Sequence, residues 1–166
     1  MRNAQLWFFR GSWSADGDLI VFSSTSTREF YEVPARGGTA NRLVWPEEPE
    51  QSLAGIVSPH FLPSEAGDRV LLFSSMAGSS NLMVQDLKTG RRELLGAGFA
   101  PVYSPSGHLV YEVFGMSTLW ALPFSLDTLK ATGEAFPIAQ NSRGPTVATD
   151  GTLVYFDSSG TSQRQG

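Results

Sequence analysis

The chain has 166 residues, of which 41% are hydrophobic and 17% are charged, and this balance predicts one folded domain and excludes an intrinsically disordered chain. Its formal net charge of -4 argues against a nucleic-acid-binding surface, which would need a basic stripe. The absence of cysteine excludes disulfides, thiolate zinc sites and a cysteine nucleophile.

The sequence as given predicts neither a membrane span nor a signal peptide. No window approaches the roughly 18 apolar residues that a membrane span requires, so we expect no span. The apolar patch near the N-terminus is shorter than the core of a signal peptide, which has about 7–15 apolar residues. We therefore expect a cytoplasmic protein from the chain as given, and a periplasmic or extracellular one if it is part of a longer protein.

The first predicted element is a short aromatic strand, Gln5–Phe9. Its sequence, QLWFF, is similar to TLWAL at Thr118–Leu122, which lies late in a later repeat. The chain is therefore expected to begin partway through a repeating unit. Residues 5–9 would then pair beside the last repeat as a closing strand.

The first complete unit covers residues 11–45. Asp16 and Gly17 form a turn, because Asp bonds to nearby backbone and Gly accepts a positive φ. Leu19–Phe22 is apolar at every position, which predicts a strand buried on both faces. Two more strands, Glu29–Pro34 and Asn41–Trp45, complete the unit.

An acidic, proline-containing loop, Pro46–Gly55, follows the first unit. Its three glutamates suggest either a metal site or a solvated loop, and the solvated loop is the favoured interpretation. The loop is also a candidate binding surface.

Three further units follow, over residues 58–97, 100–140 and 144–158. The second and third each contain four predicted strands, whereas the fourth contains one hairpin. The last connection of the third unit, Ser125–Gly133, is expected to hold one helical turn over Asp127–Ala131, capped by Ser125.

The four units repeat one pattern, in which an apolar run follows a turn and, in the first three units, an aromatic residue precedes it. The aligned turn glycines are about 40 to 50 residues apart, a period typical of blade repeats: Gly17, Gly67, Gly107 and Gly151. Small antiparallel sheets that are apolar on both faces need neighbours on both sides, and radial stacking provides them. The predicted fold is therefore all-β, with about 3.5–4 four-stranded antiparallel propeller blades per chain.

The motifs that carry these turns resemble the aromatic-Ser-Pro-Asp-Gly signature of TolB-like propeller repeats, also called WD-like repeats of the PD type. They are Trp13-Ser14-Ala15-Asp16-Gly17, Phe61-Leu62-Pro63 and Tyr103-Ser104-Pro105-Ser106-Gly107. Together with Val84–Gly90 and His108–Phe124, they are similar to the propeller found C-terminal to some bacterial serine/threonine protein kinases.

Two departures from the family limit what this resemblance implies. The units lack the Gly-His and Trp-Asp pairs of true WD repeats, and there are about four of them, where the family usually has six to eight. No kinase motif is present, so no kinase activity is implied.

An open half-propeller would expose apolar blade faces, which soluble monomers rarely do. We therefore expect a homodimer that completes a ring of seven or eight blades. A fragment of a longer propeller and a compact four-bladed monomer are the alternatives.

Catalytic chemistry finds little support in the sequence. The two histidines, His60 and His108, show no metal-ligand spacing with the carboxylates, and there is no G-x-S-x-G elbow. We therefore expect no catalytic residue, no cofactor and no metal.

The channel-side candidates for binding are Ser58, His60 and Tyr103, which lie on predicted innermost strands. Trp13, Phe61 and Tyr103 share one repeat position and are expected to pack between blades, with a stacking platform as the alternative. The predicted function is a non-enzymatic binding or scaffold module for a protein or peptide. The alternative is a propeller enzyme, or a carbohydrate- or small-ligand-binding propeller, with its site in the central channel.

Overall fold

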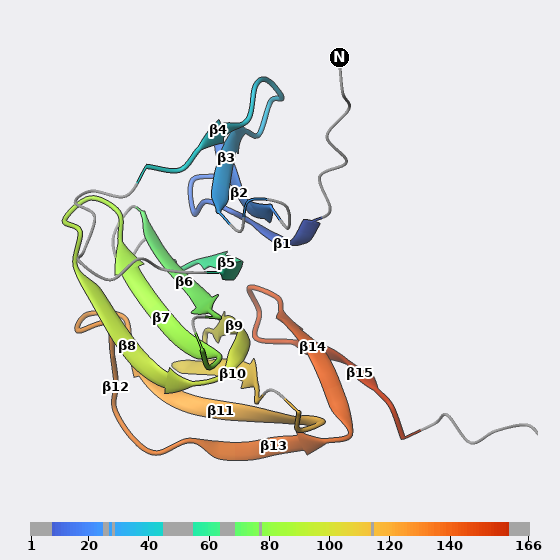
Figure 1. Cartoon of the computed structure of the whole chain (residues 1–166). Coiled ribbons are helices and arrows are strands. Elements are labelled where there is room, and N and C mark those ends of the chain that lie inside the picture. The colour runs from blue at the N-terminus through green and yellow to red at the C-terminus, as the bar shows by residue number, and fades with distance from the viewer. Residues whose placement is uncertain are drawn as a thin grey trace, which may run out of the picture.

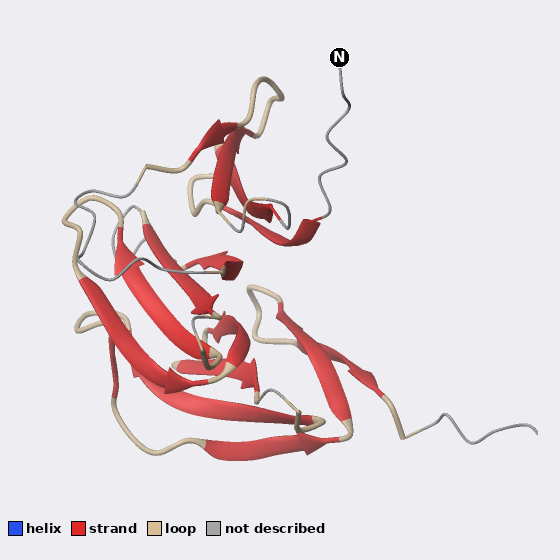
Figure 2. Ribbon diagram, in the orientation of Figure 1, coloured by secondary structure: helices blue, strands red, loops and turns tan. Residues whose placement is uncertain are grey.

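The structure is a computed structural model of the chain, and it describes residues 8–24, 27, 29–44, 55–63, 69–76, 78–113 and 115–159, without the side chains of Phe8 and Phe9. Within these residues the secondary structure consists of strands and turns (Figure 2). Two predictions fall largely outside them: the acidic loop, apart from Gly55, and residues 5–7 of the expected closing strand.

Four antiparallel sheets follow one another along the chain (Figure 1). The first contains β1 (Phe8–Trp13), β2 (Leu19–Ser24), β3 (Phe30–Pro34) and β4 (Asn41–Arg42). The second contains β5 (Ile56–Phe61), β6 (Val70–Ser75), β7 (Asn81–Asp86) and β8 (Arg92–Ala97). The third contains β9 (Phe99–Ser104), β10 (His108–Glu112), β11 (Thr118–Ser125), β12 (Lys130–Ala131) and β13 (Phe136–Gln140). The fourth contains β14 (Ser142–Val147) and β15 (Leu153–Asp157).

The sheets are arranged as the blades of a propeller. The first strand of each sheet is the innermost one, and these strands lie side by side: β1 packs against β5, β5 against β9, and β9 against β14 (Figure 1). The predicted all-β propeller architecture is therefore confirmed.

The hydrophobic core lies between neighbouring sheets, and β6 shows how. All six residues of β6 are buried. Leu71 and Phe73 belong to the cluster shared with the first sheet, whereas Val70 and Leu72 belong to the cluster shared with the third. Side chains alternate between the two faces of a strand, so a continuous apolar run serves two interfaces at once.

Three of the innermost strands contain the same bulge. Ser58, Ala100 and Gly144 have φ values of 55°, 52° and 65°, and each directly precedes a proline. The pairing register shifts at these points. The freed N–H of Ala100 donates to Ser74 Oγ (3.0 Å) and that of Gly144 to Glu112 Oε1 (2.9 Å), each on the preceding sheet. The bulges therefore join consecutive sheets as well as bending the strands.

The connection 125–133 differs from the prediction. Thr128 N–H donates to Ser125 Oγ (3.2 Å), as expected for a cap, and Leu129 N–H donates to Ser125 O (3.0 Å). Leu129 then takes a φ of 56°, and the chain returns as β12, which pairs with β11. One turn is therefore present, but it closes at Leu129 instead of covering Asp127–Ala131, because Leu129 is buried between the second and third sheets and the next two residues form β12.

The N-terminal strand also pairs differently from the expected closing strand. Phe8 pairs with Ser24 in the first sheet, so the described end of residues 5–9 belongs to β1 rather than to the fourth sheet.

Substitution of Leu72, which is fully buried, tests this packing. We expect Leu72→Ala to lower the free energy of unfolding by about 2–5 kcal/mol, because it leaves a cavity between two sheets. Leu94→Ala, at a β8 side chain that is 64% exposed, should change it by no more than about 0.5 kcal/mol. Urea unfolding followed by circular dichroism measures both, and equal losses would contradict the assignment of the core.

Candidate functional site

The innermost strands end at a hollow of 310 Å³, here called the mouth hollow. Four residues at one repeat position contribute to it, one from each sheet: Trp13, Phe61, Tyr103 and Val147. The lining is completed by residues next to these positions and in the turns that follow: Ala15, His60, Leu62, Pro63, Pro105, Ala148 and Thr149. The repeat thus places mainly apolar side chains around one end of the central axis.

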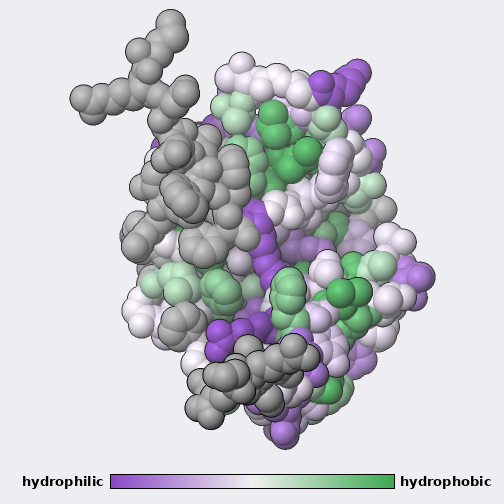
Figure 3. Space-filling model, turned by 90° about the vertical axis from the view of Figure 1, so that its right-hand side faces the viewer, coloured by the Kyte–Doolittle hydropathy of each residue, from purple (hydrophilic) through white to green (hydrophobic). Residues whose placement is uncertain are grey.

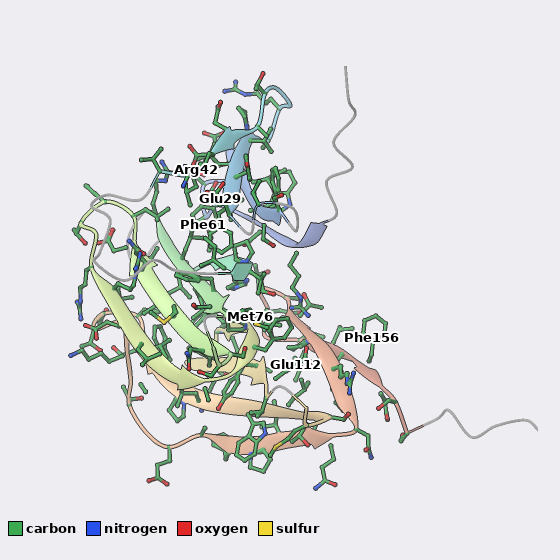
Figure 4. All side chains as sticks on the ribbon, viewed as in Figure 1. Glu29, Arg42, Phe61, Met76, Glu112 and Phe156 are labelled. Atoms are coloured by element: carbon green, nitrogen blue, oxygen red, sulfur yellow. The ribbon has the colours of Figure 1, made fainter. Side chains whose placement is uncertain are left out.

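The three aromatic residues at this position are not equivalent in the structure. Phe61 is buried between the first and second sheets, as Figure 4 shows. Tyr103 packs against the cluster between the second and third sheets, and its ring lies edge-on to Phe124 at 6.5 Å between ring centroids. Trp13 is 58% exposed. Packing was the right expectation for Phe61 and Tyr103 and the wrong one for Trp13, because no described sheet covers the outer face of the first sheet.

The predicted channel-side residues separate into two groups. His60 and Tyr103 both line the mouth hollow. Ser58 is buried, at 2% exposure, and does not contribute to that lining. Its position is that of the left-handed residue in the β5 bulge.

A second hollow of 230 Å³, here called the channel hollow, lies further along the same innermost strands. His60 lines both hollows. The remaining lining comes from one segment of each innermost strand: Arg10, Gly11, Pro59, Pro101, Val102, Gly144, Pro145 and Thr146.

Arg10 was not predicted from the sequence. Its Nη1 donates to the carbonyl oxygen of Pro145 (2.9 Å), which joins the first sheet to the fourth. The available signal was its place in the repeat, because a long cation stands where Ser58, Ala100 and Gly144 stand in the other units.

The electrostatics of the site depend on His60 and Arg10. Burial, together with the positive charge of Arg10, lowers the pKa of His60 from 6.5 to about 4, so this imidazole is neutral at physiological pH. Burial lowers the pKa of Arg10, while the negative charge of Glu112 acts in the opposite direction.

The described residues offer little for catalysis. They contain no group of three His, Asp or Glu side chains that could hold a metal ion. The Ser106 hydroxyl lies 3.2 Å from His108 Nδ1, but the same nitrogen lies 2.9 Å from the Ser106 carbonyl oxygen, so the contact belongs to an exposed turn. The described part of the chain also contains no helix of the length and hydrophobicity needed to cross a bilayer.

Radially packed antiparallel sheets with hollows along their innermost strands define a β-propeller module. No family model matches the sequence, and no curated protein matches it. Solved structures do match. TolB from Acinetobacter baumannii is 17% identical with a TM-score of 0.63, over 90% of this chain and 37% of its own.

Two further solved structures are similar in fold. Selenomethionine-substituted virginiamycin B lyase from Staphylococcus aureus is 11% identical with a TM-score of 0.58, over 95% of this chain and 51% of its own. The β-propeller domain of Cps50 (Swd1) from Myceliophteria thermophila is 13% identical with a TM-score of 0.58, over 89% of this chain and 48% of its own.

Identities this low establish the fold alone. They confirm the likeness to TolB-type propellers at that level, and the resemblance to the kinase-associated propeller stays a prediction. The chain spans between 37% and 51% of these three proteins. One of them is a lyase, so the fold by itself does not exclude catalysis.

The lowered pKa of His60 predicts a pH-dependent stability. Between pH 6.5 and pH 4 the unfolded chain protonates this imidazole and the folded chain does not. The free energy of unfolding should therefore fall as the pH falls through this window, by at most about 3 kcal/mol.

Urea unfolding of the wild type and His60→Gln at pH 7 and pH 5 measures this effect. We expect the His60→Gln variant to lose most of the difference between the two pH values, and His108→Gln to keep it. An unchanged difference in His60→Gln would show that other groups cause the pH dependence.

Proposed function

We propose that this propeller module binds an extended segment of another protein in the mouth hollow and performs no chemistry on it. The observation that supports this proposal is the lining of the hollow, where apolar side chains surround the exposed indole of Trp13. A concave, mainly apolar lining with few polar groups is typical of ligand-binding sites.

The polar groups of the mouth hollow also favour binding over catalysis. No carboxylate contributes to its described lining, and His60 is held neutral by burial. General acid–base catalysis needs a positioned pair of groups with suitable pKa values, and one neutral imidazole does not provide it. Extended segments commonly dock in grooves lined by aromatic side chains, and the mouth hollow presents Trp13 together with Pro105.

A carbohydrate-binding site is the second candidate, and the exposed indole of Trp13 is what favours it. A sugar ring could stack on this face in the way that bases and prolines stack on aromatic side chains. The apolar remainder of the lining, including Leu62 and Val147, favours the protein segment.

Selection of random heptapeptides displayed on phage against the immobilised protein tests the proposal. We expect the enriched peptides to carry apolar side chains, and Trp13→Ala to weaken their binding about 30-fold, as for a hot-spot residue worth about 2 kcal/mol. Val44→Ala, at an exposed valine that follows β4 and does not line the hollow, should leave the affinity unchanged.

Equal binding by Trp13→Ala would contradict the placement of the site. If no peptide is enriched and the protein instead binds glycans on an array in a Trp13-dependent way, the ligand is a carbohydrate and not a protein segment.

We also propose that a second copy of the chain completes the ring of seven or eight blades. In this ring the partner's fourth sheet packs beside Trp13, which then lies at the edge of the mouth hollow between the two copies. The fourth sheet has two described strands, whereas the first and second have four and the third five. Phe156 is 76% exposed, and Figure 4 shows it pointing away from the other sheets. In the second and third sheets the same position is occupied by Ser74 and Glu112. Each accepts a hydrogen bond from a backbone N–H of the next sheet.

The side of the molecule that carries β14 and β15 supports the same proposal. Val154 is 57% and Tyr155 is 41% exposed on β15. Figure 3 views the molecule from this side and shows hydrophobic patches between polar residues. Apolar side chains in such an arrangement are typical of a surface that packs against another sheet.

Light scattering across a concentration series tests this proposal. We expect a mass near twice that of the 18.0 kDa chain, and Phe156→Glu should lower it to that of the monomer. Leu94→Glu, at an exposed leucine of the second sheet, should leave the dimer intact. A folded wild-type monomer at all concentrations would overturn ring completion.

A further inference from the structure

The channel hollow contains a cation whose hydrogen-bonding capacity is largely unused. A guanidinium has five N–H donors, and Arg10 uses one hydrogen bond, from Nη1 to Pro145 O. Among the described residues no carboxylate oxygen lies within 4.0 Å of it. None of its other donor atoms is both fully buried and without a partner. These donors are therefore accessible to a ligand.

The walls of this hollow do not satisfy those donors. Pro59 and Pro101 have no N–H and present apolar rings, and Thr146 is the one described hydroxyl-bearing residue of the lining. A partly desolvated charge in such surroundings is unfavourable unless a partner compensates it. Bidentate pairing with a planar anion is the arrangement that best matches a guanidinium.

The acidic neighbour of Arg10 limits the charge of that anion. Glu112 lies within electrostatic range of Arg10, and its Oε1 accepts the N–H of Gly144 at 2.9 Å, which holds it at the bulge. His60, the other titratable residue of the lining, is neutral. The negative charge of Glu112 partly offsets the positive charge of Arg10, so the site favours a singly charged anion over a doubly charged phosphate.

We propose that the channel hollow is a carboxylate-binding site, in which Arg10 holds the carboxylate of the segment that docks at the mouth hollow. This inference rests on the proposed function, because the two hollows share His60 as a common wall. Arg10 and Trp13 are three residues apart on β1, which places them about 10 Å apart along the strand. The ligand therefore carries both an apolar side chain and a carboxylate.

Nuclear magnetic resonance with sodium acetate as the probe tests the site itself. We expect saturable shifts of the Arg10 Nε–H signal and of the Gly11 and Thr146 amide signals, and no such shifts with acetamide, which has the same shape and no charge. Arg10→Gln should abolish the amide shifts, and Arg10→Lys should weaken acetate binding at least 3-fold because it lacks the planar fork.

Arg143→Gln provides the matched control, since this exposed arginine of β14 donates to Ser117 Oγ and does not line the hollow. It should keep the response to acetate. Equal shifts with acetate and acetamide, or an acetate response that survives Arg10→Gln, would overturn the proposal. If the Arg10→Gln variant does not fold, the wild-type Arg10 Nε–H signal tests the proposal, because it should shift with acetate and not with acetamide.

The peptides selected on the mouth hollow identify the source of the carboxylate. Each is compared with a version that has an amidated C-terminus and with one that has Asn and Gln in place of Asp and Glu. We expect one of the two changes to weaken binding at least 10-fold in the wild type and to have no effect in Arg10→Gln.

The two proposals fail in different ways. Peptides that bind through Trp13 with no dependence on either change or on Arg10 would refute the carboxylate site and leave the mouth hollow standing. Acetate binding at Arg10 without any Trp13-dependent ligand would refute the mouth hollow instead.

Discussion

The structure depends on the burial of its middle strands on both faces. β6 is the clearest case, because Leu71 and Phe73 fill the interface with the first sheet while Val70 and Leu72 fill the interface with the third. A sheet that is apolar on both faces cannot bury its own residues alone, and the second and third sheets each lie between two neighbours. The stacking that results places the first strands of the sheets around one axis and thereby creates both hollows.

Most of the fold could be predicted because the same two signals occur in every unit. The turn glycines set the repeat, and the apolar run of β6 identified a strand that is buried on both faces. In the run Leu19–Phe22, for which the same was predicted, only Val21 is buried, because no described sheet covers the outer face of the first sheet. The bulges were harder to foresee. Ser58 looks like a polar channel residue in the sequence, but it takes a left-handed conformation and is buried.

The candidate site was only partly predictable, because it depends on contacts between distant units. His60 and Tyr103 were placed correctly on innermost strands, since the repeat position determines the strand. Arg10 was missed because its partner, Pro145, is 135 residues away and lies on the last innermost strand. Trp13 was expected to pack between sheets because it shares one repeat position with Phe61 and Tyr103, and only the arrangement of the sheets shows that it is exposed.

The unequal support of the sheets has a consequence for local unfolding. The second sheet is enclosed on both sides, whereas the fourth shares a smaller cluster with the third, formed by Val102, Val110 and Leu119 with Val147 and Leu153 at its edge. Amide hydrogens should therefore be protected from exchange most strongly in β6 and least in β14 and β15. Because β14 forms one wall of both hollows, a ligand bound there would tie the least stable sheet to the rest of the protein.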